Sequence, residues 1–213
     1  MTSILGANPA FEKGARHTIA NGLATVLNII ALTVCLVVFS LTVVGLPLAW
    51  SAAWTALYDW RRGGETRVMG TFWRAVATQP IRRTVIAGPA FLMTAIGAAE
   101  VSYFLHYRGP IAVVCLTTGL ITLAAGLSFA AYLLLLLTVA SPEEKGRELW
   151  RCAAAIIGRT SLTTTPAFLA QAAVAGFISY TDPGVLVVAM PVLLLWAWMR
   201  TALWGARRAG LGV

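Results

Sequence analysis

Three polar side chains interrupt long apolar runs, and they are the places where the sequence could support chemistry. Glu100 is the only carboxylate inside a predicted span, and Gln171 and Asn28 lie in two other apolar runs. An ionisable side chain deep in a bilayer is costly and usually marks the path of an ion, a proton or a polar solute. An amide at depth more often forms hydrogen bonds between helices. These residues form a candidate intramembrane polar site, with helix packing as the alternative reading of the two amides.

Glu100 has a further alternative, because it lies near the end of its span. It precedes His106 by six residues, which is about 9 Å of helix. Its carboxylate could therefore reach the headgroups or Arg108 instead of a solute.

The sequence contains no arrangement of residues typical of an enzyme. Its two histidines, His17 and His106, belong to different segments, and its three cysteines are scattered. The Gly63-Gly64 pair lacks the lysine and the serine or threonine of a phosphate-binding loop. We therefore predict a protein that is not an enzyme and that holds no cofactor and no metal ion.

The composition restricts the class of protein that carries these residues. Of 213 residues, 59% are hydrophobic and 11% are charged, against about 25% charged in a typical soluble domain. So little charge cannot cover the surface of a soluble fold. The sequence predicts an all-α, polytopic transmembrane helical bundle, with residues 1–213 forming a single integral membrane domain.

Uncharged runs between basic loops place the spans, since about 20 apolar residues cross the hydrocarbon core. Four crossings follow from residues 84–106, 111–140, 161–180 and 185–204. Residues 17–58 also lack charge, but Pro47 breaks this run because it has no amide hydrogen and disfavours helix before it. The second part, residues 48–58, is too short to cross unless the first span ends early.

The first 58 residues therefore cross once or twice, and the chain has five or six spans. The short second part favours five. Lys13 and Arg16 favour six, since a basic N-terminus is typical of the cytoplasmic side, and we prefer six.

Basic residues gather on one side of these spans. Six arginines lie in residues 59–83, four basic residues in 141–159 and three in the C-terminal tail, whereas the opposite side holds Arg108 alone. Basic loops lie on the cytoplasmic side beside anionic lipid. We predict a multi-pass protein of the bacterial cytoplasmic (inner) membrane with a cytoplasmic C-terminus, and no nucleic-acid partner for its net charge of +8.

Two cytoplasmic segments, residues 66–82 and 143–158, combine arginine, tryptophan and apolar residues at helical spacing. Such segments are typical of amphipathic helices at the membrane surface. They would equally suit docking to a soluble partner. The candidate contacts with anionic headgroups or with a partner are Arg61, Arg62, Trp73, Arg74, Trp150 and Arg151.

Residues 24–75 have a distinctive order. An apolar span with Asn28 is followed by Leu46-Pro47, a small-residue stretch ending in Ala56-Leu57-Tyr58, Arg61-Arg62-Gly63-Gly64-Glu65 and Phe72-Trp73-Arg74. This order resembles the YesL-like family of small bacterial membrane proteins, whose domain has no established function. The chain departs from many members at Gly45-Leu46-Pro47-Leu48, where they have Pro-Val-Val-Thr.

The resemblance implies an accessory, non-enzymatic membrane protein associated with a bacterial carbohydrate ABC import system. Its partners would be the permease or ATPase subunits of that system. The alternative is a self-contained small-solute transporter or channel that acts as a homo-oligomer, with Glu100 and Gln171 near its path.

Overall fold

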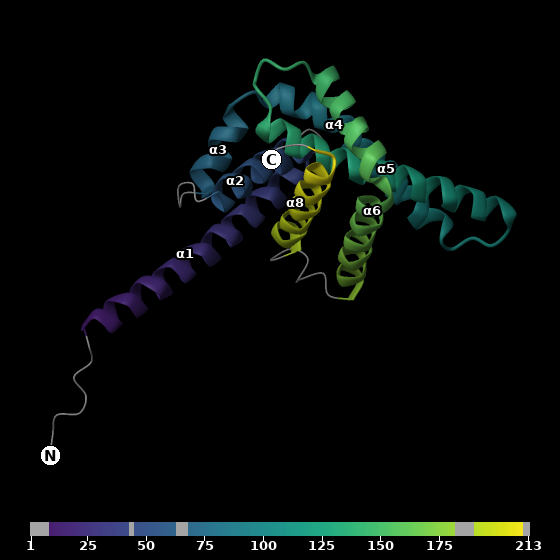
Figure 1. The fold of residues 1–213 in the computed structure, drawn as a ribbon. Helices are drawn as coiled ribbons and strands as arrows, with labels where there is room; N and C mark the ends of the chain where they lie inside the picture. The colour runs from purple at the N-terminus through teal and green to yellow at the C-terminus, as the bar shows by residue number, and fades with distance from the viewer. Residues whose placement is uncertain (1–8, 43–44, 63–67, 182–189, 211–213) are drawn as a thin grey trace.

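The structure is a computed structural model that describes residues 9–42, 45–62, 68–181 and 190–210. These residues form seven α-helices and no strand, which confirms the predicted all-α class (Figure 1). The helices are α1 (Pro9–Ser40), α2 (Gly45–Arg61), α3 (Val68–Ala77), α4 (Pro80–Phe104), α5 (Pro110–Val139), α6 (Gly146–Thr181) and α8 (Met190–Arg208). The side chains of Lys13 and Arg16 and the Gly63-Gly64-Glu65 segment lie outside the described part of the chain.

Helix α2 forms the centre of the core. It contacts α1, α3, α4, α5 and α8, and the side chains of Ala49, Ala52, Ala53 and Trp54 have no exposed surface. Small side chains let neighbouring helix backbones approach closely. The helix has 17 residues and is longer than the predicted piece at 48–58. Pro47 lies in its first turn, where proline is tolerated because those amide groups have no partner within the helix.

Helix α1 is long, and only its second half joins the core. Leu32 and Leu36 are buried against the bundle, whereas Leu23 and Leu27 are exposed. Figure 1 shows the N-terminal half of α1 projecting away from the other helices. Its contacts are with α2, α3 and α8.

Helices α4 and α5 form an antiparallel hairpin whose outer half also projects from the core (Figure 1). Glycines bring their backbones together: a Cβ added to Gly97 would lie 2.7 Å from the Cα of Leu123, and one added to Gly126 would lie 2.9 Å from the Cα of Thr94. Contact between small residues replaces the hydrophobic effect as the means of pairing helices in lipid. The second half of α5, from Leu127 onward, is part of the core.

Helices α6 and α8 lie side by side and complete the bundle (Figure 1). The first half of α6 buries Leu149, Ala153 and Ile156 in the core. The sequence predicted a separate surface segment at 143–158, but most of it belongs to α6, which begins at Gly146 and continues to Thr181 without a break. A change from charged to apolar residues alters the preferred depth in a membrane, not the backbone hydrogen bonds of the helix.

Three of the described helices are long and apolar enough to cross a membrane: α1 over Leu23–Ser40, α4 and α5. They indicate a membrane protein, as predicted. Helix α2 is shorter, the uncharged second half of α6 is rich in threonine, and α8 contains three arginines. The larger count of five or six crossings therefore stays a prediction.

Candidate functional site

Glu100 lies opposite a glycine of the other helix of the hairpin. A Cβ added to Gly119 of α5 would lie 2.9 Å from the Cβ of Glu100. One carboxylate oxygen, Oε2, is buried and has no hydrogen-bond partner. Glu100 forms no ion pair with Arg108, although the structure describes both residues, and His106 approaches the carbonyl of Ser102 instead, at 3.2 Å. Burial of a carboxylate oxygen without a partner is unfavourable. Packing between α4 and α5 therefore does not explain why a glutamate occupies this position.

Gln171 joins α6 to α8. Its Nε2 donates to the hydroxyl of Thr201 at 2.9 Å, and that hydroxyl donates to the carbonyl of Ala197 at 3.1 Å. The other amide atom, Oε1, is buried without a partner. Half of the amide therefore has the interhelical role that is common in membranes, and the other half has an unused acceptor.

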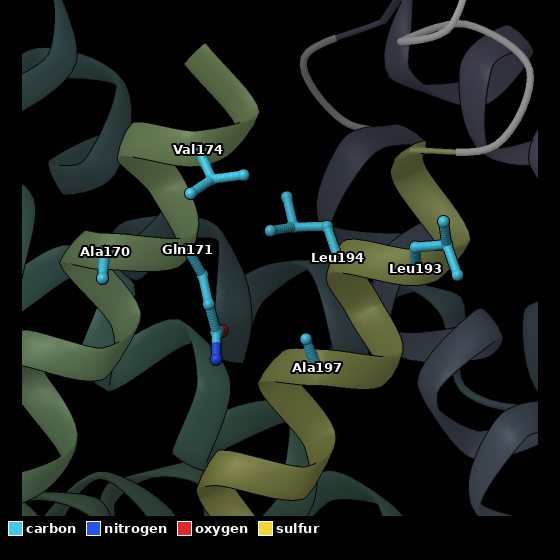
Figure 2. A pocket seen from close by; sticks show the side chains of 6 residues that line it. All are labelled: Ala170, Gln171, Val174, Leu193, Leu194 and Ala197. Atoms are coloured by element: carbon cyan, nitrogen blue, oxygen red, sulfur yellow. The ribbon is translucent and has the colours of Figure 1, made fainter. Parts of the chain in front are cut away.

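The hollow beside Gln171 is apolar (Figure 2). It has a volume of about 380 Å³ and is lined by Ala170, Gln171, Val174, Leu193, Leu194 and Ala197. Figure 2 shows the amide of Gln171 pointing between the two helices, while the other lining side chains are aliphatic. Such a lining suits a hydrocarbon chain better than a polar solute.

A larger hollow of about 590 Å³ lies between the hairpin and the α6–α8 pair. Its lining is mostly aliphatic and includes Val101, Leu123, Leu169 and Trp198. The indole N–H of Trp198 is buried without an acceptor. This surface therefore also favours apolar contact.

The structure does not bring the three predicted intramembrane residues together. Glu100 lies against α5, Gln171 bonds α8, and Asn28 belongs to α1. Among the described residues, α1 has no contact with α4, α5 or α6.

A group of hydroxyls that the sequence analysis did not single out holds α5 against α6. The fully buried Tyr132 donates to Thr164 Oγ1 at 3.2 Å, and its oxygen lies 3.1 Å from Thr160 Oγ1. One turn earlier, Ser128 Oγ lies 3.2 Å from Thr165 Oγ1. Residues four apart share a helix face, and this spacing of hydroxyls on both helices was the available signal. The group is satisfied internally, which indicates a structural role.

The predicted cytoplasmic contact residues are divided between the surface and the interior. Trp73 is 49% exposed, and Arg74 beside it on α3 is exposed. Arg61 and Arg62 are exposed at the end of α2, where the Arg62 guanidinium lies 5.1 Å from the centre of the Tyr58 ring.

On α6, the predicted contact residues Trp150 and Arg151 differ in exposure. Arg151 is exposed. The indole of Trp150 instead donates to the backbone carbonyl of Ile86 at 3.1 Å and lies against Phe129. Trp150 therefore has an internal contact that the sequence did not predict.

Comparison of the chain with protein-family models, with curated proteins and with solved structures found no match. The resemblance to the YesL-like family therefore depends on the motifs of residues 24–75.

Proposed function

We propose that the protein is an accessory, non-enzymatic membrane subunit that binds the permease of a bacterial carbohydrate ABC importer within the bilayer. The observation that carries this proposal is the α4–α5 hairpin, whose outer half stands away from the core (Figure 1). Its glycines pair the two helices with each other, which leaves large apolar side chains on the outside. The exposed ones include Leu92, Ile96, Ile111, Val114 and Ile121. Exposed apolar area of this kind suits lipid or the helices of another membrane protein.

The identity of the partner comes from the resemblance to the YesL-like family. The cytoplasmic side offers a second contact, because Trp73 and Arg74 are exposed on α3. Tryptophan and arginine are enriched where proteins bind one another. An ATPase subunit or anionic headgroups would suit this face.

We further propose that the chain crosses the bacterial inner membrane five or six times, with its C-terminus in the cytoplasm. Aromatic residues at the tip of the hairpin support the depth that this assigns to α4: Tyr103 lies 5.0 Å from both Phe104 and Tyr107, measured between ring centres. Aromatic residues gather at membrane–water boundaries. Tyr107 donates a hydrogen bond of 3.1 Å to Tyr103, which raises the pKa of Tyr107.

Helices α6 and α8 would provide further crossings. The Arg200 guanidinium lies 4.7 Å from the centre of the Trp196 ring on the same helix. A cation on an aromatic face is partly compensated when it leaves water. Its long stem also lets the charge reach the boundary.

Photocrosslinking in the native membrane tests the accessory role. A photoreactive residue in place of Ile121 should crosslink to an ABC permease subunit that mass spectrometry identifies. The matched control is Leu162, which is also aliphatic and is 93% exposed, but lies on α6. Crosslinks from Ile121 to a second copy of this chain alone would contradict the proposal and favour a homo-oligomer.

A self-contained transporter or channel is the second candidate. The observation that favours it is the buried Oε2 of Glu100, which has no partner. In this case Glu100→Gln should abolish solute flux in proteoliposomes that contain the protein alone. Unchanged flux would remove the residue on which this candidate depends.

A further inference from the structure

Two consecutive arginines line a hollow where the start of α4 meets the end of α5. The hollow has a volume of about 170 Å³, enough for about five water molecules. Besides Arg82 and Arg83, its lining includes Thr78, Gln79, Thr138 and Ala140. Both arginines belong to the basic segment 59–83, and their positions in the sequence do not indicate a site.

The charge of Arg82 is not neutralised by a carboxylate. Its Nη1 donates to Gln79 Oε1 at 2.9 Å, and its Nη2 donates to the backbone carbonyls of Ser141 and Glu144 at 3.2 and 2.7 Å. Every one of these acceptors is uncharged. Glu143 and Glu144 follow in the same loop, but neither carboxylate forms an ion pair with Arg82 in the described part of the chain. The side chain is held in place while its positive charge stays available.

The charge of Arg83 is likewise not neutralised by a carboxylate of the described residues, and Arg83 has more N–H donors without an acceptor there. Its Nη1 donates to the carbonyl of Ser51 at 3.2 Å and to Thr55 Oγ1 at 3.1 Å. A guanidinium has five N–H donors, and the structure uses only those on Nη1. The Nε and Nη2 donors of Arg83, and Nε of Arg82, have no acceptor among the described residues. Two positioned cations therefore offer several free N–H groups beside one hollow.

The backbone adds positive potential at the same place. The N-terminus of a helix is electropositive and favours anions. Helix α4 begins here with two arginines in its first two turns, an arrangement that the helix dipole alone disfavours. Gln79, the residue before the helix, does not cap it, because its side-chain oxygen accepts from Arg82. An anion in the hollow would offset all three sources of positive potential.

We propose that this hollow binds a phosphate group, supplied by an anionic phospholipid headgroup or by free phosphate. Helix α4 is one of the helices apolar enough to cross a membrane, so its first turn lies at the depth of lipid phosphates. Paired guanidinium donors match the geometry of phosphate oxygens. The inference depends on α4 crossing the membrane and does not depend on an ABC partner.

Thermal melting of the purified full chain in a neutral maltoside detergent tests the site. Added phosphatidylglycerol should raise the Tm by about 5 °C at saturation, whereas phosphatidylcholine, which has no net charge, should have little effect. In Arg82→Gln and in Arg83→Gln, the lipid concentration for half of this shift should rise by about tenfold. Arg147→Gln is the matched control, because Arg147 is exposed in the first turn of α6 and does not line the hollow, and it should keep the wild-type response.

Loss of Arg83 also removes a contact with α2, so a second variant keeps the test independent of folding. Ala140→Leu adds a side chain to the lining without changing any charge, and it should weaken the lipid response as strongly as the arginine variants. Inorganic phosphate at matched ionic strength distinguishes the source: an equal shift supports a site for the free ion, and no shift supports one for the lipid. A full lipid response in Ala140→Leu and both arginine variants would overturn the proposal. So would an equal loss in Arg147→Gln, because it would indicate a diffuse charge effect.

Discussion

The indole nitrogen of Trp150 on α6 donates a hydrogen bond of 3.1 Å to the backbone carbonyl of Ile86 on α4. The same indole lies against Phe129 of α5, with 4.9 Å between ring centres. One side chain therefore connects three helices at the core end of the hairpin. These contacts hold the core end of the α4–α5 hairpin against α6, so the position of the hairpin depends on Trp150.

Replacing Trp150 with phenylalanine should keep an aromatic ring beside Phe129 but remove the donor. We expect the free energy of unfolding to fall by about 1–2 kcal/mol, because the carbonyl of Ile86 loses a partner. Thermal melting in detergent measures the change. Trp73→Phe is the control, since Trp73 is half exposed and its indole nitrogen bonds no described residue. An equal loss in both variants would show that the Ile86 contact has no special weight.

The glycines of the hairpin provide a second prediction with a control on the same helix. Gly97→Ala would put a Cβ 2.7 Å from the Cα of Leu123, and backbone cannot easily move away. We expect a loss of about 2 kcal/mol in the free energy of unfolding, as for other overpacked contacts. A Cβ on Gly88 of the same helix meets no atom within 4 Å. Gly88→Ala should therefore be neutral or stabilise the protein by about 0.5–1 kcal/mol. A Gly97→Ala protein that melts like wild type would mean that the hairpin is loosely packed.

The sequence predicted the hairpin well. The predicted spans 84–106 and 111–140 correspond to α4, Pro80–Phe104, and α5, Pro110–Val139. The uncharged length of a segment and a short Gly-Pro turn determine such a pair locally. Helix α4 begins four residues before the predicted span, and these residues include Arg82 and Arg83. A span defined by the absence of charged residues cannot include them.

The interior could not be predicted in the same way. Hydropathy does not distinguish a helix that faces lipid from one that faces protein, so the sequence does not predict that α2 lies at the centre of the core. The Arg82–Arg83 hollow is formed with residues near 138–142, and the Tyr132–Thr164 bond joins residues 32 positions apart. Contacts between distant residues depend on how helices pack, which a single sequence does not show.

The cluster of hydroxyl side chains between α5 and α6 supplies a third prediction. Tyr132→Phe removes the hydroxyl that contacts Thr160 and Thr164, but both threonines keep backbone acceptors, the carbonyls of Ile156 and Thr160. We therefore expect a modest loss of about 1 kcal/mol in the free energy of unfolding. A double-mutant cycle with Thr164→Val should give a coupling energy of about 0.5 kcal/mol or more. Simple additivity would mean that the hydroxyls are near one another without interacting.

The proposed orientation is the last prediction, and cysteine labelling tests it. The three native cysteines, Cys35, Cys115 and Cys152, are free and are first replaced by alanine. A cysteine in place of Gly109, in the turn of the hairpin, should react in intact cells with a thiol reagent that cannot cross the membrane.

A cysteine in place of Glu144, in the loop between α5 and α6, should react only after the cells are permeabilised. Both positions are solvent-exposed, and they flank α5 at its opposite ends. The basic residues near Glu144 and their scarcity near Gly109 predict that Glu144 is cytoplasmic. The reverse labelling pattern would contradict that orientation, and it would place the Arg82–Arg83 hollow at the outer leaflet of the membrane.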